Sequence, residues 1–153
     1  MVFKMKASTA SEVKLAEFIA AQDPVYGQVL RELRAGRKET HWIWFIFPQL
    51  AGLGSSSMSE KFGITSKAEA QAYLHHPVLG SRLRECTELM LGLRDRNVDE
   101  ILGYPDNLKF CSCMTLFAAA APAEPIFKAA LDKYFGGKPD QITLSLLHEN
   151  IDG

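Results

Sequence analysis

Helix-start signals recur along this chain, and they limit the folds that are open to it. In a capping box, a Ser or Thr side chain and a Glu side chain three residues later accept hydrogen bonds from each other's backbone N–H groups in the first turn of a helix. The sequence has this spacing at Thr9–Glu12, Ser57–Glu60 and Ser66–Glu69. Prolines and glycines stand where such helices begin or end. The pattern predicts an all-α fold.

The same signals divide the chain into helices of ordinary length. Asp23 and Pro24 end the first helix and are expected to cap and begin the second, which closes at Gly36. In residues 77–93, apolar side chains recur alternately every four and three residues, which is typical of an amphipathic helix. The expected helices, including one short capped turn, span residues 9–22, 23–36, 66–76, 77–93, 97–103, 105–121, 124–135 and 140–149.

The segment Trp42–Phe47 is the one serious candidate for a β-strand, because it is a short run of aromatic and β-branched residues. A strand needs a partner, and the sequence has no second run of this character. We therefore interpret the segment as a short buried helix that ends before Pro48. Ile43, Phe45 and Phe47 are expected to lie in the core.

The composition is that of a globular protein and argues against several classes of partner. With 153 residues, 47% of them hydrophobic, we expect a single compact domain over 1–153, with about seven to nine helices and a loose segment at 1–8. The net charge of -1 gives no extended basic field for nucleic acid. No apolar run approaches the ~20 residues of a membrane span. Three cysteines, an odd number, argue against a disulfide framework and indicate a reducing cytoplasm.

Two sets of side chains suggest a metal site, but neither has the necessary spacing. Cys111 and Cys113 would point to nearly opposite faces of a helix, and no second Cys or His pair lies at zinc-ligand spacing. His75 and His76 are adjacent and cannot both face one ion without other ligands, so a capping or hydrogen-bonding role is expected. We predict neither a metal nor a cofactor.

The sequence contains the residue types of a hydrolytic triad but lacks the motif that would position its nucleophile. Ser55–Ser57 supply hydroxyl groups, and His41 or His148 supplies an imidazole. The sequence lacks a Gly-x-Ser-x-Gly elbow that would expose a nucleophile, so we disfavour a triad. His41 stays the candidate acid–base residue, because an imidazole transfers protons near neutral pH. Whether the protein is an enzyme stays open at this point.

The loop Gly52–Ser57 has two interpretations. Its glycines permit tight curvature, and a helix that starts at its end would direct backbone N–H groups toward an anion. Equally, two glycines can form a turn and a serine can cap a helix with nothing bound. The loop lacks the Gly-Lys-Ser/Thr ending of a nucleotide P-loop, so an anion would also need a cation such as Lys61 or Lys109.

Four motifs follow one another in the chain: RKETHWIWFIFPQL (37–50), EAQAYLHHPVLGSRL (69–83), MTLF (114–117) and YFGG (134–137). Together they resemble a bacterial, mainly α-helical family of unknown function that is sometimes labelled calpastatin-like, over about residues 15–147. The resemblance implies an orthogonal array of helices and carries no reaction or catalytic residue. Where the family pattern usually reads KLRSSM, this chain has KFCSCM (109–114), which leaves Lys109 and Ser112 as the matching polar pair.

Two hypotheses about function follow. The first is a small-molecule binder or enzyme with a polar and aromatic pocket for a nucleotide-like or phosphorylated ligand, of which ADP-ribose-type metabolites are an example. Its candidate residues combine aromatic rings, loop N–H groups, an imidazole and a cation: His41, Trp42, Trp44, Gln49, Gly54, Ser55, Ser57, Lys109 and Ser112. The alternative is a non-catalytic protein-interaction module or homodimer, with the Trp-rich segment at an interface.

Overall fold

Helices make up nearly all of the regular structure. The computed structural model of the protein describes residues 10–150, with side-chain environments for residues 12–148. The expected loose segment at 1–8 and the Thr9 cap lie outside these residues. The helices are α1 (Ala10–Gln22), α2 (Tyr26–Ala35), α3 (Ile43–Ile46), α4 (Ser57–Phe62), α5 (Lys67–His75), α6 (Leu79–Gly92), α7 (Val98–Leu102), α8 (Asp106–Ala120), α9 (Pro125–Phe135) and α10 (Gln141–Asn150).

The all-α fold class is confirmed, with ten helices in the described part of the chain where about seven to nine were expected. The additional helix is the short α4, of which the sequence indicates only the capping box; the short helices α3 and α7 were expected. The segment after Trp42 forms a short helix, α3. This confirms the prediction of a helix, which was made because the sequence offers no partner for a strand here. The described residues contain no strand, and the single parallel bridge joins Leu50 to Ile64. This bridge holds the chain entering α4 beside the chain leaving it.

Several helix starts lie where the capping signals place them, and two are shifted. Ser66 accepts a hydrogen bond from Glu69 N, and Asn97 forms a complete capping box with Glu100. At α4 the cap is Ser56 rather than Ser57, because Ser56 Oγ is the atom that accepts from Ser59 N. Asp23 does not cap α2, which begins at Tyr26; its carboxylate instead pairs with Arg82 at 2.9 Å.

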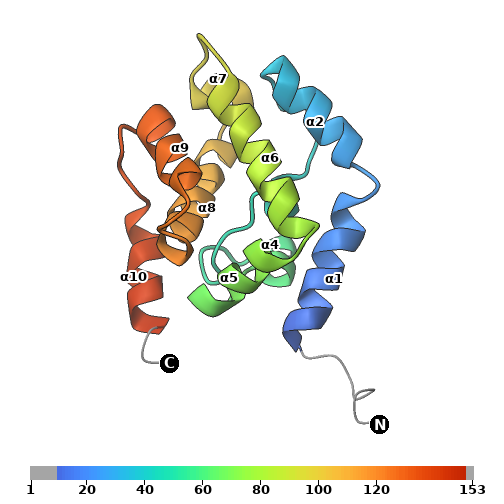
Figure 1. Cartoon of the computed structure of the whole chain (residues 1–153), viewed down its shortest axis with the longest axis vertical. Helices are drawn as coiled ribbons and strands as arrows, with labels where there is room; N and C mark the ends of the chain where they lie inside the picture. Colours follow the sequence, from blue (N-terminus) through green and yellow to red (C-terminus); the bar gives the residue numbers. More distant parts are fainter. Residues whose placement is uncertain (1–9, 151–153) are drawn as a thin grey trace.

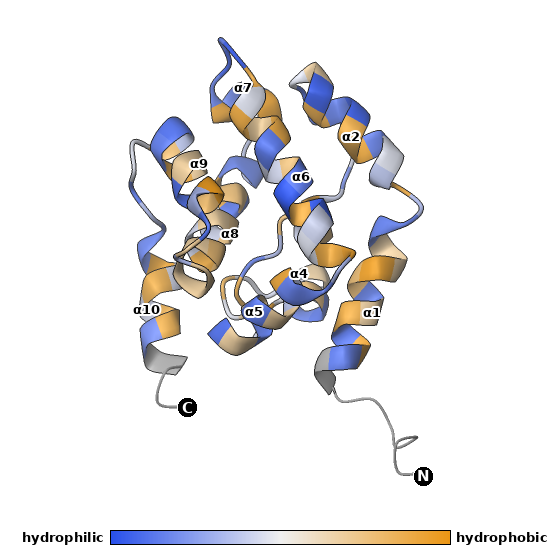
Figure 2. Cartoon of the chain, in the orientation of Figure 1, coloured by the Kyte–Doolittle hydropathy of each residue, from blue (hydrophilic) through white to orange (hydrophobic). Residues whose placement is uncertain are grey.

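α6 runs through the middle of the molecule, with α1 and α2 on one side and α8, α9 and α10 on the other (Figure 1). α6 packs against α2, α5 and α9, and α8 packs against α3, α5, α9 and α10. Apolar and polar residues alternate along α1 and α10, so that each helix has one face for the interior (Figure 2). None of the described helices is long and apolar enough to cross a bilayer.

Aromatic side chains form much of the core beneath α3. Phe47 contacts Phe110 of α8 in an edge-to-face pair with ring centroids 4.8 Å apart. Phe45, also buried, lies against Phe62 of α4, with centroids 5.5 Å apart. Ile43, Phe45 and Phe47 are all buried, as the sequence predicts. The packing therefore fixes α3 between α4 and α8.

Candidate functional site

A cavity of about 340 Å³ opens between the α3–α4 loop, the first half of α8 and the start of α10. Its apolar part includes Leu50, Leu53 and Phe62. Its polar side chains are Gln49 of the α3–α4 loop, Ser59 of α4, Lys109 and Ser112 of α8, and Asp140 at the start of α10. The cavity is within the usual size range of small-molecule sites, which combine an apolar lining with a few polar groups.

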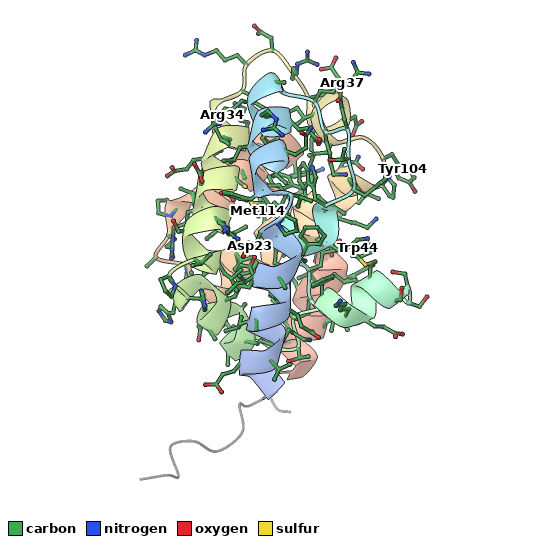
Figure 3. The ribbon with its side chains drawn as sticks, turned by 90° about the vertical axis from the view of Figure 1, so that its right-hand side faces the viewer. Asp23, Arg34, Arg37, Trp44, Tyr104 and Met114 are labelled. Carbon is green, nitrogen blue, oxygen red and sulfur yellow. The ribbon has the colours of Figure 1, made fainter. Side chains whose placement is uncertain are left out.

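Trp44 and Lys109 form one wall of this cavity. The Lys109 ammonium lies 4.7 Å from the centroid of the Trp44 ring, a cation–π arrangement. The ammonium is also 3.8 Å from Oδ1 of Asp106, which is beyond ordinary hydrogen-bond distance. Trp44 is half-buried and lies on the same side of the molecule as Tyr104, which precedes the cavity residue Pro105 (Figure 3).

Asp140 contributes a carboxylate to the cavity while it caps α10. Its Oδ2 accepts hydrogen bonds from Thr143 N at 3.0 Å and from Thr143 Oγ1 at 2.5 Å. The Ser112 hydroxyl lies 3.2 Å from the same oxygen. Among the described residues, none donates a hydrogen bond to Oδ1 of Asp140. The fold therefore engages Oδ2, while Oδ1 has no donor among the described residues.

Asp106 links the cavity to a second lysine. Its Oδ2 lies 2.7 Å from the ammonium of Lys38, whose side chain is only 6% exposed. Lys38 Nζ also donates to the Thr40 carbonyl at 2.6 Å and lies 4.9 Å from the ring centroid of Trp42. Each tryptophan of the motif therefore has a lysine ammonium over its ring, and both lysines contact the carboxylate of Asp106.

Trp42 is held away from the cavity by Glu32. Trp42 Nε1 donates a 2.8 Å hydrogen bond to Oε1 of Glu32, and the two side chains are 1% and 3% exposed. Glu32 also accepts hydrogen bonds from Glu39 N, Thr40 N, Thr40 Oγ1 and Gln28 Nε2. Burial by itself raises the pKa of Glu32, but hydrogen bonds from Thr40, Glu39, Gln28 and Trp42 outweigh burial and lower it to about 2.

Comparison with known protein families identifies the family of this chain. Residues 12–147 match the model of a family described as "Protein of unknown function (DUF1810)". The chain belongs to this family. It is similar to the solved structure of the conserved hypothetical protein Rv1873 from Mycobacterium tuberculosis, with 55% identity over 88% of this chain and 96% of that chain and a TM-score of 0.87. No curated protein matches the chain.

The structure brings five of the predicted site residues of this DUF1810 protein to the cavity: Trp44, Gln49, Gly54, Lys109 and Ser112. The other four lie elsewhere. His41, Ser55 and Ser57 are exposed and outside the lining, and Trp42 is in the core. The loop Gly52–Ser57 contributes Leu53 and Gly54 to the cavity, and α4 contributes Ser59 and Phe62. α4 has six residues, and the N–H of Ser59 is already bonded to Ser56 Oγ.

The structure shows the surroundings of His76, Cys111 and Cys113, three of the residues of the two disfavoured metal sites in this DUF1810 protein. His76 Nδ1 accepts hydrogen bonds from Val78 N at 3.1 Å and Leu79 N at 3.3 Å, which confirms the capping role expected from the sequence. Cys113 is buried, and Cys111 is half-buried beside the carbonyl of Lys138. In the described part of the chain, no three His, Cys, Asp or Glu side chains converge as a metal site would need.

Sequence reasoning missed three charged residues that the structure places at or behind the cavity. Asp140 is recognisable in the sequence only as a helix cap, and Lys38 and Asp106 resemble other charged residues near helix ends. Lys38 and Asp140 come near α8 through tertiary packing, in which Lys38 contacts Asp106 and Asp140 contacts Ser112. The only local signal is that Asp106 precedes Lys109 by three residues, a spacing that puts both on one side of a helix.

Proposed function

We propose that this DUF1810 protein binds a small phosphorylated, nucleotide-like metabolite in the cavity between α3, α8 and α10, with ADP-ribose-type compounds among the candidates. The observation that carries the proposal is the presence of Lys109 and Asp140, one cation and one carboxylate, in the same largely apolar cavity. Such a pair suits a ligand that bears both an anionic group and hydroxyl groups.

Lys109 supplies the anion-binding end. Lys38, Asp106 and Lys109 form a cluster of two ammonium groups and one carboxylate, which leaves one net positive charge. The side chain of Lys109 is 17% exposed, so this charge is partly shielded from water and attracts a phosphate more strongly than a fully exposed lysine would. The Lys109 ammonium lies over the ring of Trp44, and this contact restricts where the ammonium can move.

Asp140 supplies the hydroxyl-binding end. A carboxylate oxygen accepts hydrogen bonds from sugar hydroxyls, and Oδ1 has no donor among the described residues. The same charge repels a second phosphate, so Asp140 favours the sugar part of a ligand over its anionic part. Gln49 and Ser59 line the cavity and offer further amide and hydroxyl groups.

The apolar lining suits the rest of such a ligand. Leu108 and Ile142 line the cavity although their side chains are 52% and 63% exposed. Exposed apolar side chains at a cavity mouth gain by being covered, and a nucleobase offers a flat surface of that kind. The volume of about 340 Å³ limits the ligand to the size of a nucleotide, or requires part of a larger one to stay outside.

The proposal concerns binding and assigns no proton transfer to His41, since His41 does not line the cavity. The alternative of an interface formed by the Trp-rich segment has less support, because Trp42 is in the core and Trp44 faces the cavity. We place the binding in a single domain and in a reducing cytoplasm, where Cys86, Cys111 and Cys113 would stay free thiols.

Thermal shift and calorimetry test the proposal with AMP, ADP-ribose, NAD and ribose 5-phosphate. We expect at least one compound to stabilise the protein, and Lys109→Met and Asp140→Asn each to weaken its binding about tenfold or more. Asn is a good N-cap, so Asp140→Asn keeps the start of α10. His41→Ala and Ser55→Ala, at exposed positions outside the cavity, are the matched controls and should bind normally. The proposal would be overturned if none of the four compounds binds, or if neither Lys109→Met nor Asp140→Asn weakens the binding.

A further inference from the structure

The two tryptophans of the motif support two lysines that compete for one carboxylate. Lys38 lies over Trp42 and Lys109 lies over Trp44, with ammonium-to-centroid distances of 4.9 and 4.7 Å. Asp106 lies between them and contacts each lysine with a different oxygen, Oδ2 toward Lys38 and Oδ1 toward Lys109. Only Trp44 and Lys109 line the cavity, so the other half of this arrangement lies behind the wall.

The sharing of Asp106 is unequal. The contact with Lys38 is 2.7 Å, a charge-assisted hydrogen bond, whereas the contact with Lys109 is 3.8 Å. Because the charged hydrogen bond engages one oxygen closely, Asp106 is held on the side of Lys38. The Lys109 ammonium therefore makes no close hydrogen bond to Asp106, and the cluster of two lysines and one carboxylate keeps one net positive charge beside the cavity.

Lys38 is itself held in place by its neighbours. Its backbone N–H donates to the Ile101 carbonyl at 2.7 Å, and its ammonium donates to the Thr40 carbonyl at 2.6 Å. The residues that follow it are tied to Glu32 through Glu39 N at 2.8 Å and Thr40 N at 3.1 Å. Burying a lysine is costly, and a buried ion pair is weak evidence for a role in stability. A role at the cavity explains why a charged side chain occupies this position.

We propose that Lys38 is a positioning residue of the cavity. By binding Asp106 it prevents that carboxylate from neutralising Lys109, and it so keeps Lys109 available for the anionic group of a ligand. Lys38 does not touch the ligand and acts only through Asp106. The inference rests on the proposed function for the identity of the ligand, but the charge state of the cavity that it predicts does not depend on any ligand.

Quenching of Trp44 fluorescence by iodide tests this charge state directly. The chain has two tryptophans, so Trp42→Phe leaves Trp44 as the single reporter and keeps an aromatic ring under Lys38. Iodide is attracted by positive charge near the ring, whereas neutral acrylamide reports exposure alone. The ratio of the two quenching constants therefore measures the potential at the cavity wall. A change of one unit charge within a few ångström alters this ratio about twofold after salt screening.

Four variants in the Trp42→Phe background separate the proposed role from a structural one. Lys38→Met should lower the ratio about twofold because Asp106 then pairs with Lys109, and Asp106→Asn should raise it by a similar factor. The double variant should return to the background value, since one positive charge again lies in the cluster. Lys38→Arg, which keeps the charge, should stay close to the background value.

The double variant decides the question even where Lys38→Met perturbs the local fold. If Lys38 only supported residues 38–40, Asp106→Asn would not restore the ratio, and that result would overturn the proposal. An unchanged ratio in Lys38→Met would overturn it as well. ADP-ribose binding, measured in parallel with Trp42 intact, should weaken in Lys38→Met and recover in the double variant. Failure of the unmodified protein to bind ADP-ribose would count against that compound as ligand and leave the quenching result to decide on Lys38.

Discussion

Trp42 Nε1 donates a 2.8 Å hydrogen bond to Oε1 of Glu32, and this bond joins two side chains that are both almost completely buried. Glu32 is the one acidic residue in the buried part of the described chain, and it accepts five hydrogen bonds. It thereby ties α2 to the segment before α3. Two residues after Trp42, Trp44 lines the cavity.

Removal of the Glu32 carboxylate should be strongly destabilising. Glu32→Ala leaves the buried Trp42 Nε1 and four part-buried donors without their acceptor, and we expect the free energy of unfolding to fall by about 3–5 kcal/mol. Urea denaturation followed by circular dichroism measures the change. Glu39→Ala is the matched control, since Glu39 is an exposed glutamate in the connected segment, and it should change stability by less than about 0.5 kcal/mol. Equal losses in both variants would contradict the assignment.

Stability should also depend on pH through Glu32. The pKa of Glu32 is lowered from about 4.5 to about 2 in the folded protein, so its stabilisation is fully present above about pH 4.5 and is lost as the pH falls through about 2. This amounts to about 3 kcal/mol. Glu32→Gln, compared with the unmodified protein by urea denaturation between pH 6 and pH 2.5, should lose that part of the pH dependence. Glu124, whose pKa is lowered by its hydrogen bond to Arg84, contributes equally to both proteins and cancels in the difference. Parallel pH curves would show that Glu32 is not the responsible group.

Two glycines of α6 should respond oppositely to alanine. A Cβ atom on Gly80 would lie 2.0 Å from the Leu74 carbonyl oxygen, so Gly80→Ala forces α5 and α6 apart and should cost about 3 kcal/mol or slightly more. Gly92 has no atom within 4 Å of such a Cβ, and alanine has the higher helix propensity. Gly92→Ala should therefore stabilise the protein by a few tenths to about 1 kcal/mol. Thermal unfolding of both variants checks the opposite signs, and a stabilising Gly80→Ala would refute the close approach of the two helices.

The three thiols should react slowly while the protein is folded. Burial raises the pKa of Cys86 to about 12 and that of Cys113 well above its usual range. Burial and the charge of Asp140 raise the pKa of Cys111 to about 11. At pH 8 little thiolate is present, so iodoacetamide should modify Cys111 first and slowly, and the two buried thiols only after unfolding. Mass spectrometry over time in buffer and in denaturant measures the order; fast labelling of Cys113 in buffer would contradict the described packing.

Much of the helical framework could be predicted from local sequence. The caps at Ser66 and Asn97 and the close of α2 at Gly36, with φ of 75°, follow from interactions within a few residues. Exact helix starts were harder to predict. Ser56 and Ser57 are both competent caps, and the backbone path into α4 decides between them. Asp23 was expected to cap α2, but Arg82 on α6 pairs with its carboxylate, and α2 begins at Tyr26.

Local sequence predicts only part of the grouping of the cavity residues. Trp44, Gln49 and Gly54 are near one another in the sequence, and Lys109 and Ser112 share a side of α8, so each set could be predicted to act together. Trp42 and Trp44 could not be told apart by composition, because both are large aromatic residues in one motif. A glutamate ten residues earlier, Glu32, draws Trp42 into the core by accepting from its ring N–H.

The sequence by itself determined the all-α fold, most helix boundaries and the core role of Ile43, Phe45 and Phe47, because capping and helical periodicity act over three or four residues. Only the tertiary structure decided that Asp140 joins the cavity and that Lys38 and Lys109 share Asp106. Lys38 and Asp140 are separated by about a hundred residues and are brought near α8 by the packing of helices. Electrostatic interactions act through space, and their partners are set by distances that local sequence does not contain.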